Sequence, residues 1–252
     1  MTARQDLRRT GAGIRQQLGM DNQAEAELLP GLEHLIDEIV FARVWARPGL
    51  ALEDRMLATL AALTSKQYLP QLADLVGAAL HMKMKPSLIQ EVMLHCAIYA
   101  GMPTAVNSLE VVRNVLAENN VPQPEAELEE ADIDALMAMG QKTMYALHLE
   151  RAEGGYAAPG SAASGLYATA IDYLYGEVWN RTGITIRQRM ICSIAAFTAT
   201  QLDSQQRKFF RSALNVGLSR VEILEVIGQT GPYSGFPQAF NALAVAEEVL
   251  AD

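Results

Sequence analysis

The sequence has 252 residues, half of them apolar and 19% charged, which is enough to bury a core and excludes a disordered chain. Its net charge of −9, without a cluster of Lys and Arg, excludes a typical nucleic-acid binder, because phosphate contacts need clustered positive charge. Cys96 and Cys192 form no C-x-x-C pair, and we find neither an apolar leader nor an apolar run of membrane length. We therefore expect a cytoplasmic protein without disulfide bonds that interacts with neither nucleic acid nor membrane.

The first half of the chain predicts helices, and strand signals are scarce throughout. Apolar residues form a helical stripe over 53–64. A second helix is predicted over 86–100, because Pro86 suits a first helical turn. Gly101 can end that helix and Pro103 can begin the next.

A Pro-containing acidic linker, "NNVPQPEAELEEADID" (119–134), separates the two halves. A helical segment follows at about 132–151, and the small residues of 154–165 indicate a flexible loop. We expect residues 1–28 to form a short helix in the place that 132–151 occupies in the second half.

The chain contains an internal repeat. Residues 165–252 align with residues 31–118 without a gap, at a constant offset of 134, and 28 of the 88 aligned positions are identical. Such identity through helices and loops indicates a duplication. The sequence therefore predicts an all-α protein with two tandem helical domains, at 1–120 and 130–252.

One segment differs informatively between the two copies. The first copy reads "LHCAIYAGMP" (94–103) and the second reads "GQTGPYSGFP" (228–237). Tyr, Gly and Pro recur, which predicts a shared corner between two helices, but His95 is replaced by Gln229. Pro232 falls inside the second helix, which we expect to kink or to stop early. If one half is catalytic, the first half is the better candidate, because Gln cannot exchange protons near pH 7.

Glu91, His95 and Tyr99 are spaced i, i+4 and i+8, which puts all three on one face of a helix. Such a ladder offers a carboxylate that can orient an imidazole, an imidazole that can move a proton, and a phenol that can donate a hydrogen bond.

Both repeats resemble the carboxymuconolactone decarboxylase family in its tandem form. The resemblance lies in "VWARPGLALEDRMLATLAAL", "YGEVWNRTGITIRQRMICSIAAF" and "IQEVMLHCAIYAGMPTAVNSLEV". It implies two helical domains like those of the alkylhydroperoxidase-D class. It also implies a cofactor-free carboxy-lyase of the γ-carboxymuconolactone decarboxylase type, active in aromatic catabolism and assembled as a homotrimer with pseudo-hexameric symmetry.

Peroxidase chemistry in that class uses a C-x-x-C pair and a His one turn later. Neither 63–80 nor 197–214 contains a Cys, and the expected His is replaced by Leu75 and Phe209. A dithiol mechanism needs two thiols within reach of one another, so we reject it here.

Under the resemblance, His95 would move the proton, Tyr99 would stabilise developing charge and Glu91 would orient His95. Arg47 or Arg55 would bind a carboxylate of a small acidic substrate, because a guanidinium matches a carboxylate bidentately. No cofactor is required, and no metal-ligand spacing is found.

A structural role is the alternative for most of these residues, because they recur in the copy that lacks the His. The recurring pairs are Glu91 and Glu225, Tyr99 and Tyr233, Arg47 and Arg181, and Arg55 and Arg189. His34, His81 and His148 have no ligand-like partners in the sequence.

Two functional alternatives remain open. The same ladder would serve another proton-shuttling lyase or an isomerase. The chain could also be a non-catalytic, ring-forming or ligand-binding homologue, which a His95 sealed in a dry core with no cavity beside it would favour.

Overall fold

The computed structural model describes residues 3–20, 28–125, 130–153 and 162–251, and these residues form helices without a strand. The all-α prediction is confirmed. None of the helices in these ranges is both long enough and apolar enough to cross a membrane. Most of the predicted loop at 154–165 lies outside the described residues.

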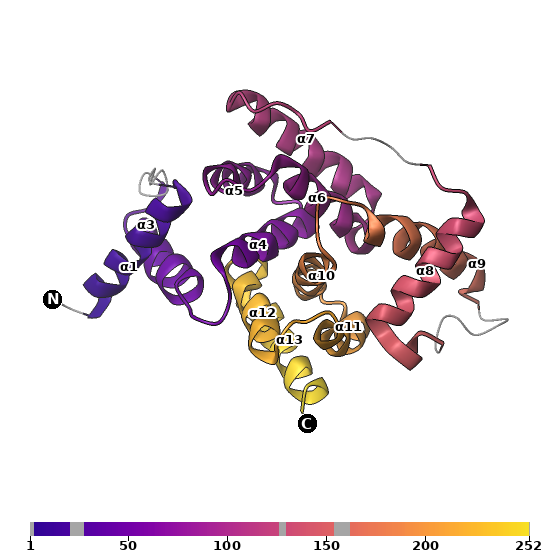
Figure 1. Cartoon of the computed structure of the whole chain (residues 1–252). Helices are drawn as coiled ribbons and strands as arrows, with labels where there is room; N and C mark the ends of the chain where they lie inside the picture. Colours follow the sequence, from indigo (N-terminus) through magenta and orange to yellow (C-terminus); the bar gives the residue numbers. More distant parts are fainter. Residues whose placement is uncertain (1–2, 21–27, 126–129, 154–161, 252) are drawn as a thin grey trace.

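Each half consists of an N-terminal arm followed by four core helices (Figure 1). The arm comprises the elements between residues 3 and 45 in the first half and between residues 133 and 180 in the second. The first half contains α1 (Ala3–Leu18), α3 (Leu32–Leu35), η1 (Ile36–Trp45), α4 (Leu52–Lys66), α5 (Leu69–His81), α6 (Pro86–Ala100) and α7 (Met102–Glu118). The second half contains α8 (Ile133–His148), η2 (Leu149–Glu153), α9 (Ser164–Thr169), η4 (Ala170–Glu177), η5 (Val178–Asn180), α10 (Ile186–Thr200), α11 (Asp203–Asn215), α12 (Arg220–Ser234) and α13 (Phe236–Val249). Every core helix of the second half begins 134 residues after its counterpart, which confirms the duplication.

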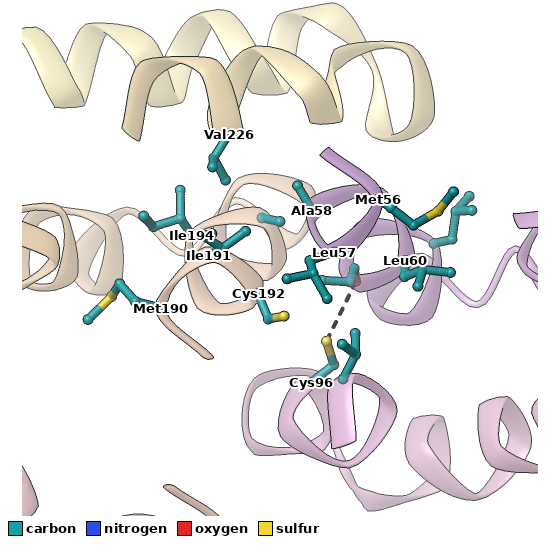
Figure 2. Packing of buried hydrophobic residues seen from close by; sticks show 14 of the residues in the cluster. Met56, Leu57, Ala58, Leu60, Cys96, Met190, Ile191, Cys192, Ile194 and Val226 are labelled. Atoms are coloured by element: carbon teal, nitrogen blue, oxygen red, sulfur yellow. Dashed lines mark hydrogen bonds between the residues drawn. The ribbon is translucent and has the colours of Figure 1, made fainter. Parts of the chain in front are cut away.

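The core is shared between the halves. Helices α4 and α10 pack against each other, and α6 and α12 each contact both of them. Figure 2 shows Leu57 and Ala58 of α4 beside Ile191 of α10, with Val226 of α12 and Cys96 of α6 on either side. The buried apolar residues of both halves therefore form one cluster. The domain limits at 1–120 and 130–252 stay a prediction, because the halves do not have separate cores.

The two arms are built alike. Helix α1 packs along η1 as α8 packs along η4. A Cβ on Gly11 would collide with the carbonyl of Asp37, and a Cβ on Gly140 would collide with the carbonyl of Ile171. Ile171 is the residue that corresponds to Asp37 in the repeat. Both contacts need glycine, because only glycine lets two helix backbones approach so closely. The prediction that the N-terminal helix matches the one near 132–151 is confirmed.

The predicted corner is present in both halves. Gly101 has φ 100° and joins α6 to α7, and Gly235 has φ 108° and joins α12 to α13. These left-handed conformations favour glycine. The expected early stop at Pro232 is wrong, since α12 continues to Ser234, and the alternative of a kink stays a prediction. Pro232 lies in the last turn, where its missing N–H removes only one hydrogen bond near the helix end.

Candidate active site between the halves

Helix α6 presents the predicted ladder of Glu91, His95 and Tyr99. The rings of His95 and Tyr99 meet edge to face, with their centroids 5.6 Å apart. His95 has no exposed surface, and Glu91 is 7% exposed. The ladder faces α10 of the other half, so its partners come from there.

Ser193 of α10 connects His95 and Tyr99. Its hydroxyl oxygen lies 2.9 Å from His95 Nε2 and 2.9 Å from the Tyr99 hydroxyl. Ser193 also donates to the carbonyl of Arg189, 3.0 Å away. Since its only hydrogen is engaged there, Ser193 accepts hydrogen bonds from both His95 and Tyr99. His95 therefore carries its hydrogen on Nε2, and Nδ1 keeps a lone pair.

Glu91 contacts the arginines of the other half. Arg181 Nε donates to one carboxylate oxygen at 2.9 Å, and Arg189 Nη2 donates to the other at 3.0 Å. Arg189 also donates to the carbonyl of Arg181 at 2.8 Å. Among the described contacts Glu91 makes no hydrogen bond to His95, so Ser193 rather than Glu91 orients the imidazole.

The structure places Arg47 and Arg55 away from the ladder. Arg47 binds Glu225 with a shortest distance of 2.6 Å, and Arg55 reaches the same carboxylate at 2.9 Å. Arg55 also donates to Gln229 at 3.0 Å. Each half therefore supplies its arginines to the opposite half, and the role of Arg47 or Arg55 in binding a carboxylate stays a prediction.

The electrostatics of the ladder follow from burial. Burial, and after it the positive charge of Arg189, hold the pKa of His95 well below its ordinary value. The imidazole is therefore neutral at physiological pH. Burial raises the pKa of Tyr99 well above its ordinary value, so the phenol keeps its proton.

Three buried polar atoms of this site have no hydrogen-bond partner among the described residues: His95 Nδ1, Arg189 Nε and Arg189 Nη1. In the other half the corresponding guanidinium nitrogen, Arg55 Nη1, donates to Gln229. Unpaired polar atoms are uncommon in a protein interior. The nearby charge of Arg189 helps to keep the His95 imidazole neutral, with its Nδ1 unprotonated.

A pocket of about 300 Å³ opens beside the ladder. Its walls combine aromatic and aliphatic side chains, and its polar side chains include Tyr99, Gln205 and Lys208. His95 itself does not line the pocket. It lies behind Tyr99 and Trp179, and its ring centroid is 4.8 Å from that of Trp179. The complete burial of His95 is what a non-catalytic role predicts. The pocket nevertheless lies on the other side of Tyr99, which is a ring neighbour of His95.

A second pocket, of about 310 Å³, occupies the repeat-related place in the other half. It is lined by Leu63, Tyr68, Gln71, Pro232 and Tyr233. Tyr233 corresponds to Tyr99, and its hydroxyl accepts a 2.7 Å hydrogen bond from Trp45. This pocket has no His behind its tyrosine.

Sequence reasoning did not identify the side chains that the second half contributes to the His95 site. The side chains concerned are Trp179, Arg181, Arg189 and Ser193, and the repeat carries the signal for one of them. Ser193 follows Arg189 by four residues, as Thr59 follows Arg55, which marks one polar face on α10 and on α4. Over the described ranges, no three His, Cys, Asp or Glu side chains gather as a metal site would require.

Two segments, 30–114 and 165–248, match the sequence model of the carboxymuconolactone decarboxylase family. The chain is 32% identical over 80 residues to 4-carboxymuconolactone decarboxylase of Acinetobacter baylyi, covering 32% of this chain and 60% of that protein. It is 31% identical over 87 residues to nitrosuccinic acid decarboxylase of Metarhizium robertsii, covering 34% and 60% respectively. An uncharacterised 15.0 kDa protein of Paracoccus denitrificans is 31% identical over 87 residues, covering 34% and 65%. The chain thus spans less than two thirds of each relative.

Proposed function

Because this chain belongs to the carboxymuconolactone decarboxylase family, we propose that it is a carboxy-lyase that removes CO₂ from a small carboxylate metabolite. Two relatives named as decarboxylases support this class of reaction. The proposed site is the pocket lined by Tyr99, and the first half supplies its ladder. The lack of a cofactor, the homotrimer, the cytoplasmic location and a role in aromatic catabolism stay predictions.

The observation that carries the proposal is the chain of contacts from the pocket to His95. Tyr99 lines the pocket, its hydroxyl lies 2.9 Å from Ser193, and Ser193 lies 2.9 Å from His95. The repeat-related pocket keeps the tyrosine but has Gln229 in place of the histidine. The residue that follows the shared glutamate by one helical turn therefore carries an imidazole at one of two similar pockets and an amide at the other.

Decarboxylation breaks a carbon–carbon bond and leaves the electron pair on the substrate, where hydrogen-bond donors stabilise it. The protonated Tyr99 hydroxyl can turn its hydrogen from Ser193 toward this developing charge. His95 and Ser193 hold the hydroxyl in place. In this proposal Tyr99 touches the substrate, and His95 acts through it rather than by direct contact.

A matched pair of variants tests the site. Tyr99→Phe removes the hydroxyl at the proposed site, and Tyr233→Phe removes it at the repeat-related pocket. CO₂ release would be measured with 4-carboxymuconolactone, nitrosuccinate and related acids. We expect kcat to fall about 100-fold or more for Tyr99→Phe, the usual effect of losing one such donor, and to change little for Tyr233→Phe. Equal effects of the two changes would contradict the assignment.

His95→Gln tests the residue behind the tyrosine. Gln is accommodated at the equivalent position, where Gln229 accepts from Arg55 at 3.0 Å and donates to Thr59 at 3.0 Å. The variant should therefore fold, and CO₂ release should fall at least about tenfold because Gln cannot reproduce the imidazole's hold on Ser193. Unchanged turnover in a folded variant would remove His95 from the mechanism.

A non-catalytic ligand-binding role is the second candidate, and the complete burial of His95 favours it. In that case carboxylates would bind with no CO₂ release and no change in the ligand. A third outcome, consumption of the acid without CO₂ release, would indicate an isomerase or another lyase. Product analysis by NMR on the same panel separates the three.

A further inference from the structure

Besides Tyr99, the pocket has a second polar end, at Lys208. Lys208 of α11 lines the pocket and is partly buried. Arg151 of η2 lies beside it, donating to the Lys208 carbonyl at 3.3 Å and to the Ser212 hydroxyl at 3.2 Å. One cation thus lines the pocket, and a second lies beside its helix.

These cations lack a balancing acid. Among the described side chains, no carboxylate lies within ion-pair distance of Lys208 or Arg151. Burial, and then the neighbouring Arg151, lower the pKa of Lys208 below its ordinary value. Partly desolvated like charges are unfavourable, and a bound anion would relieve them. The cluster also stands out in a chain whose net charge is −9.

A buried histidine adds no charge to this end. His148, at the end of α8, lies 2.7 Å from the Ser212 hydroxyl through Nδ1 and 3.4 Å from the Tyr175 hydroxyl through Nε2. Burial, and after it Lys208 and Arg151, lower the pKa of His148 to about 3, so the imidazole is neutral. Ser212 donates to the Lys208 carbonyl at 3.1 Å, which leaves it to accept from His148 and Arg151. This network fixes Arg151 against the Lys208 turn.

The repeat shows that this end is not a general feature of the fold. The positions that correspond to Lys208, Tyr175 and Ser212 are Asp74, Phe41 and Ala78. The repeat-related pocket is therefore lined without a lysine. Since all three differ while the neighbouring Gln205 recurs as Gln71, packing alone does not require them.

We propose that Lys208 is the anion anchor of this pocket, so that a carboxylate of the ligand lies against its ammonium group while the ligand's apolar body packs against Trp179 and Phe209. The sequence assigned carboxylate binding to Arg47 and Arg55, which the structure pairs with Glu225. The inference rests on the proposed function for the identity of the pocket, but it concerns binding and not turnover.

Benzoate and benzamide test the anchor, because they have nearly the same shape and differ in charge. Calorimetric titration of the whole chain should show tighter binding of benzoate than of benzamide. Lys208→Met, which removes the charge and shortens the unbranched side chain by one atom, should weaken benzoate at least tenfold and benzamide less than twofold. Lys208→Arg should keep the preference for benzoate. Lys85→Met, at an exposed position of the first half, is the control for the change in net charge.

Three results would overturn the inference: the unaltered protein fails to bind benzoate, Lys208→Met binds it as well as the unaltered protein does, or Lys208→Met loses both probes equally. The two proposals fail separately. Benzoate binding that depends on Lys208, in a chain that decarboxylates none of the tested acids, would contradict only the proposed function. Decarboxylation with an unchanged KM in Lys208→Met would contradict only the anchor.

Discussion

The two half-sites share one frame of Glu and Arg residues and differ in the side chain that follows the glutamate on its helix. In each, a helix of one half presents a glutamate to two arginines of the other half: Glu91 to Arg181 and Arg189, and Glu225 to Arg47 and Arg55. One helical turn later, the first site has His95 and the second has Gln229. The Glu and Arg residues therefore belong to the structure that joins the halves, and the histidine is what distinguishes the sites.

The amide completes its site better than the imidazole does. Gln229 accepts from Arg55 and donates to Thr59, so both ends of its side chain are bonded. His95 bonds only through Nε2, and Nδ1 and Arg189 Nη1 remain without partners. Arg189 Nε also lacks a partner among the described residues, as does its counterpart Arg55 Nε, so the first site has three such atoms and the second has one. Unsatisfied buried polar atoms cost stability, and natural proteins keep such sites mainly for function.

The glutamates should show the largest difference between the sites. Glu91→Gln leaves the buried Arg189 without a counter-charge, and losing one partner of a buried ion pair costs about 3–5 kcal/mol. Glu225→Gln should cost less, because Arg47 is 55% exposed while Arg181 is 31% exposed. Arg55 also keeps Gln229 and the carbonyls of the 47–48 segment. Urea unfolding of both variants measures the difference, and a larger cost for Glu225→Gln would contradict it.

The hydroxyl groups of α10 and α4 should give a smaller difference. Ser193→Ala leaves both His95 Nε2 and the Tyr99 hydroxyl without an acceptor, whereas Thr59→Val leaves only the Gln229 amide without one. Each stranded buried group costs about 1–3 kcal/mol. Ser193→Ala should therefore destabilise the protein more, as measured by thermal unfolding with both variants at the same pH. A smaller loss for Ser193→Ala would show that water replaces its contacts.

Helix positions, the corner glycines and the duplication were predictable because they depend on local pattern. The i, i+4, i+8 spacing put Glu91, His95 and Tyr99 on one face, and the structure keeps that face intact. The arginine partners were not predictable. Each half carries the same two arginines, so the sequence fixes their helices but not which half they face.

His148 shows the same limit. No partner for it could be predicted, because Ser212 and Tyr175 approach it from α11 and η4, which come later in the chain. A signal was nevertheless present in the repeat, where Tyr175 and Ser212 replace Phe41 and Ala78. Two polar replacements in one copy indicate a polar cluster when the copies are otherwise alike. Their meeting point could be known only from the packing of the arm.

The smallest expected difference between the half-sites is their response to acid. The pKa of His95 is lowered in the folded protein, so below about pH 6.5 the unfolded chain binds a proton that the folded chain does not. The free energy of unfolding therefore falls as the pH drops, by up to about 1.4 kcal/mol per pH unit for each such histidine. His148 has a lowered pKa as well, so the unaltered protein should show the contributions of both.

His95→Gln should make this dependence shallower by one proton between pH 6.5 and 5, and the remaining slope should belong largely to His148. The reciprocal Gln229→His should make it steeper, provided that the new imidazole is equally buried between Arg55 and Thr59. Urea midpoints at pH 7, 6 and 5 measure all three slopes. Equal slopes for the unaltered protein and His95→Gln would mean that His95 takes up a proton in the folded state. In that case the neutral, unpaired Nδ1 could not be what distinguishes the two half-sites.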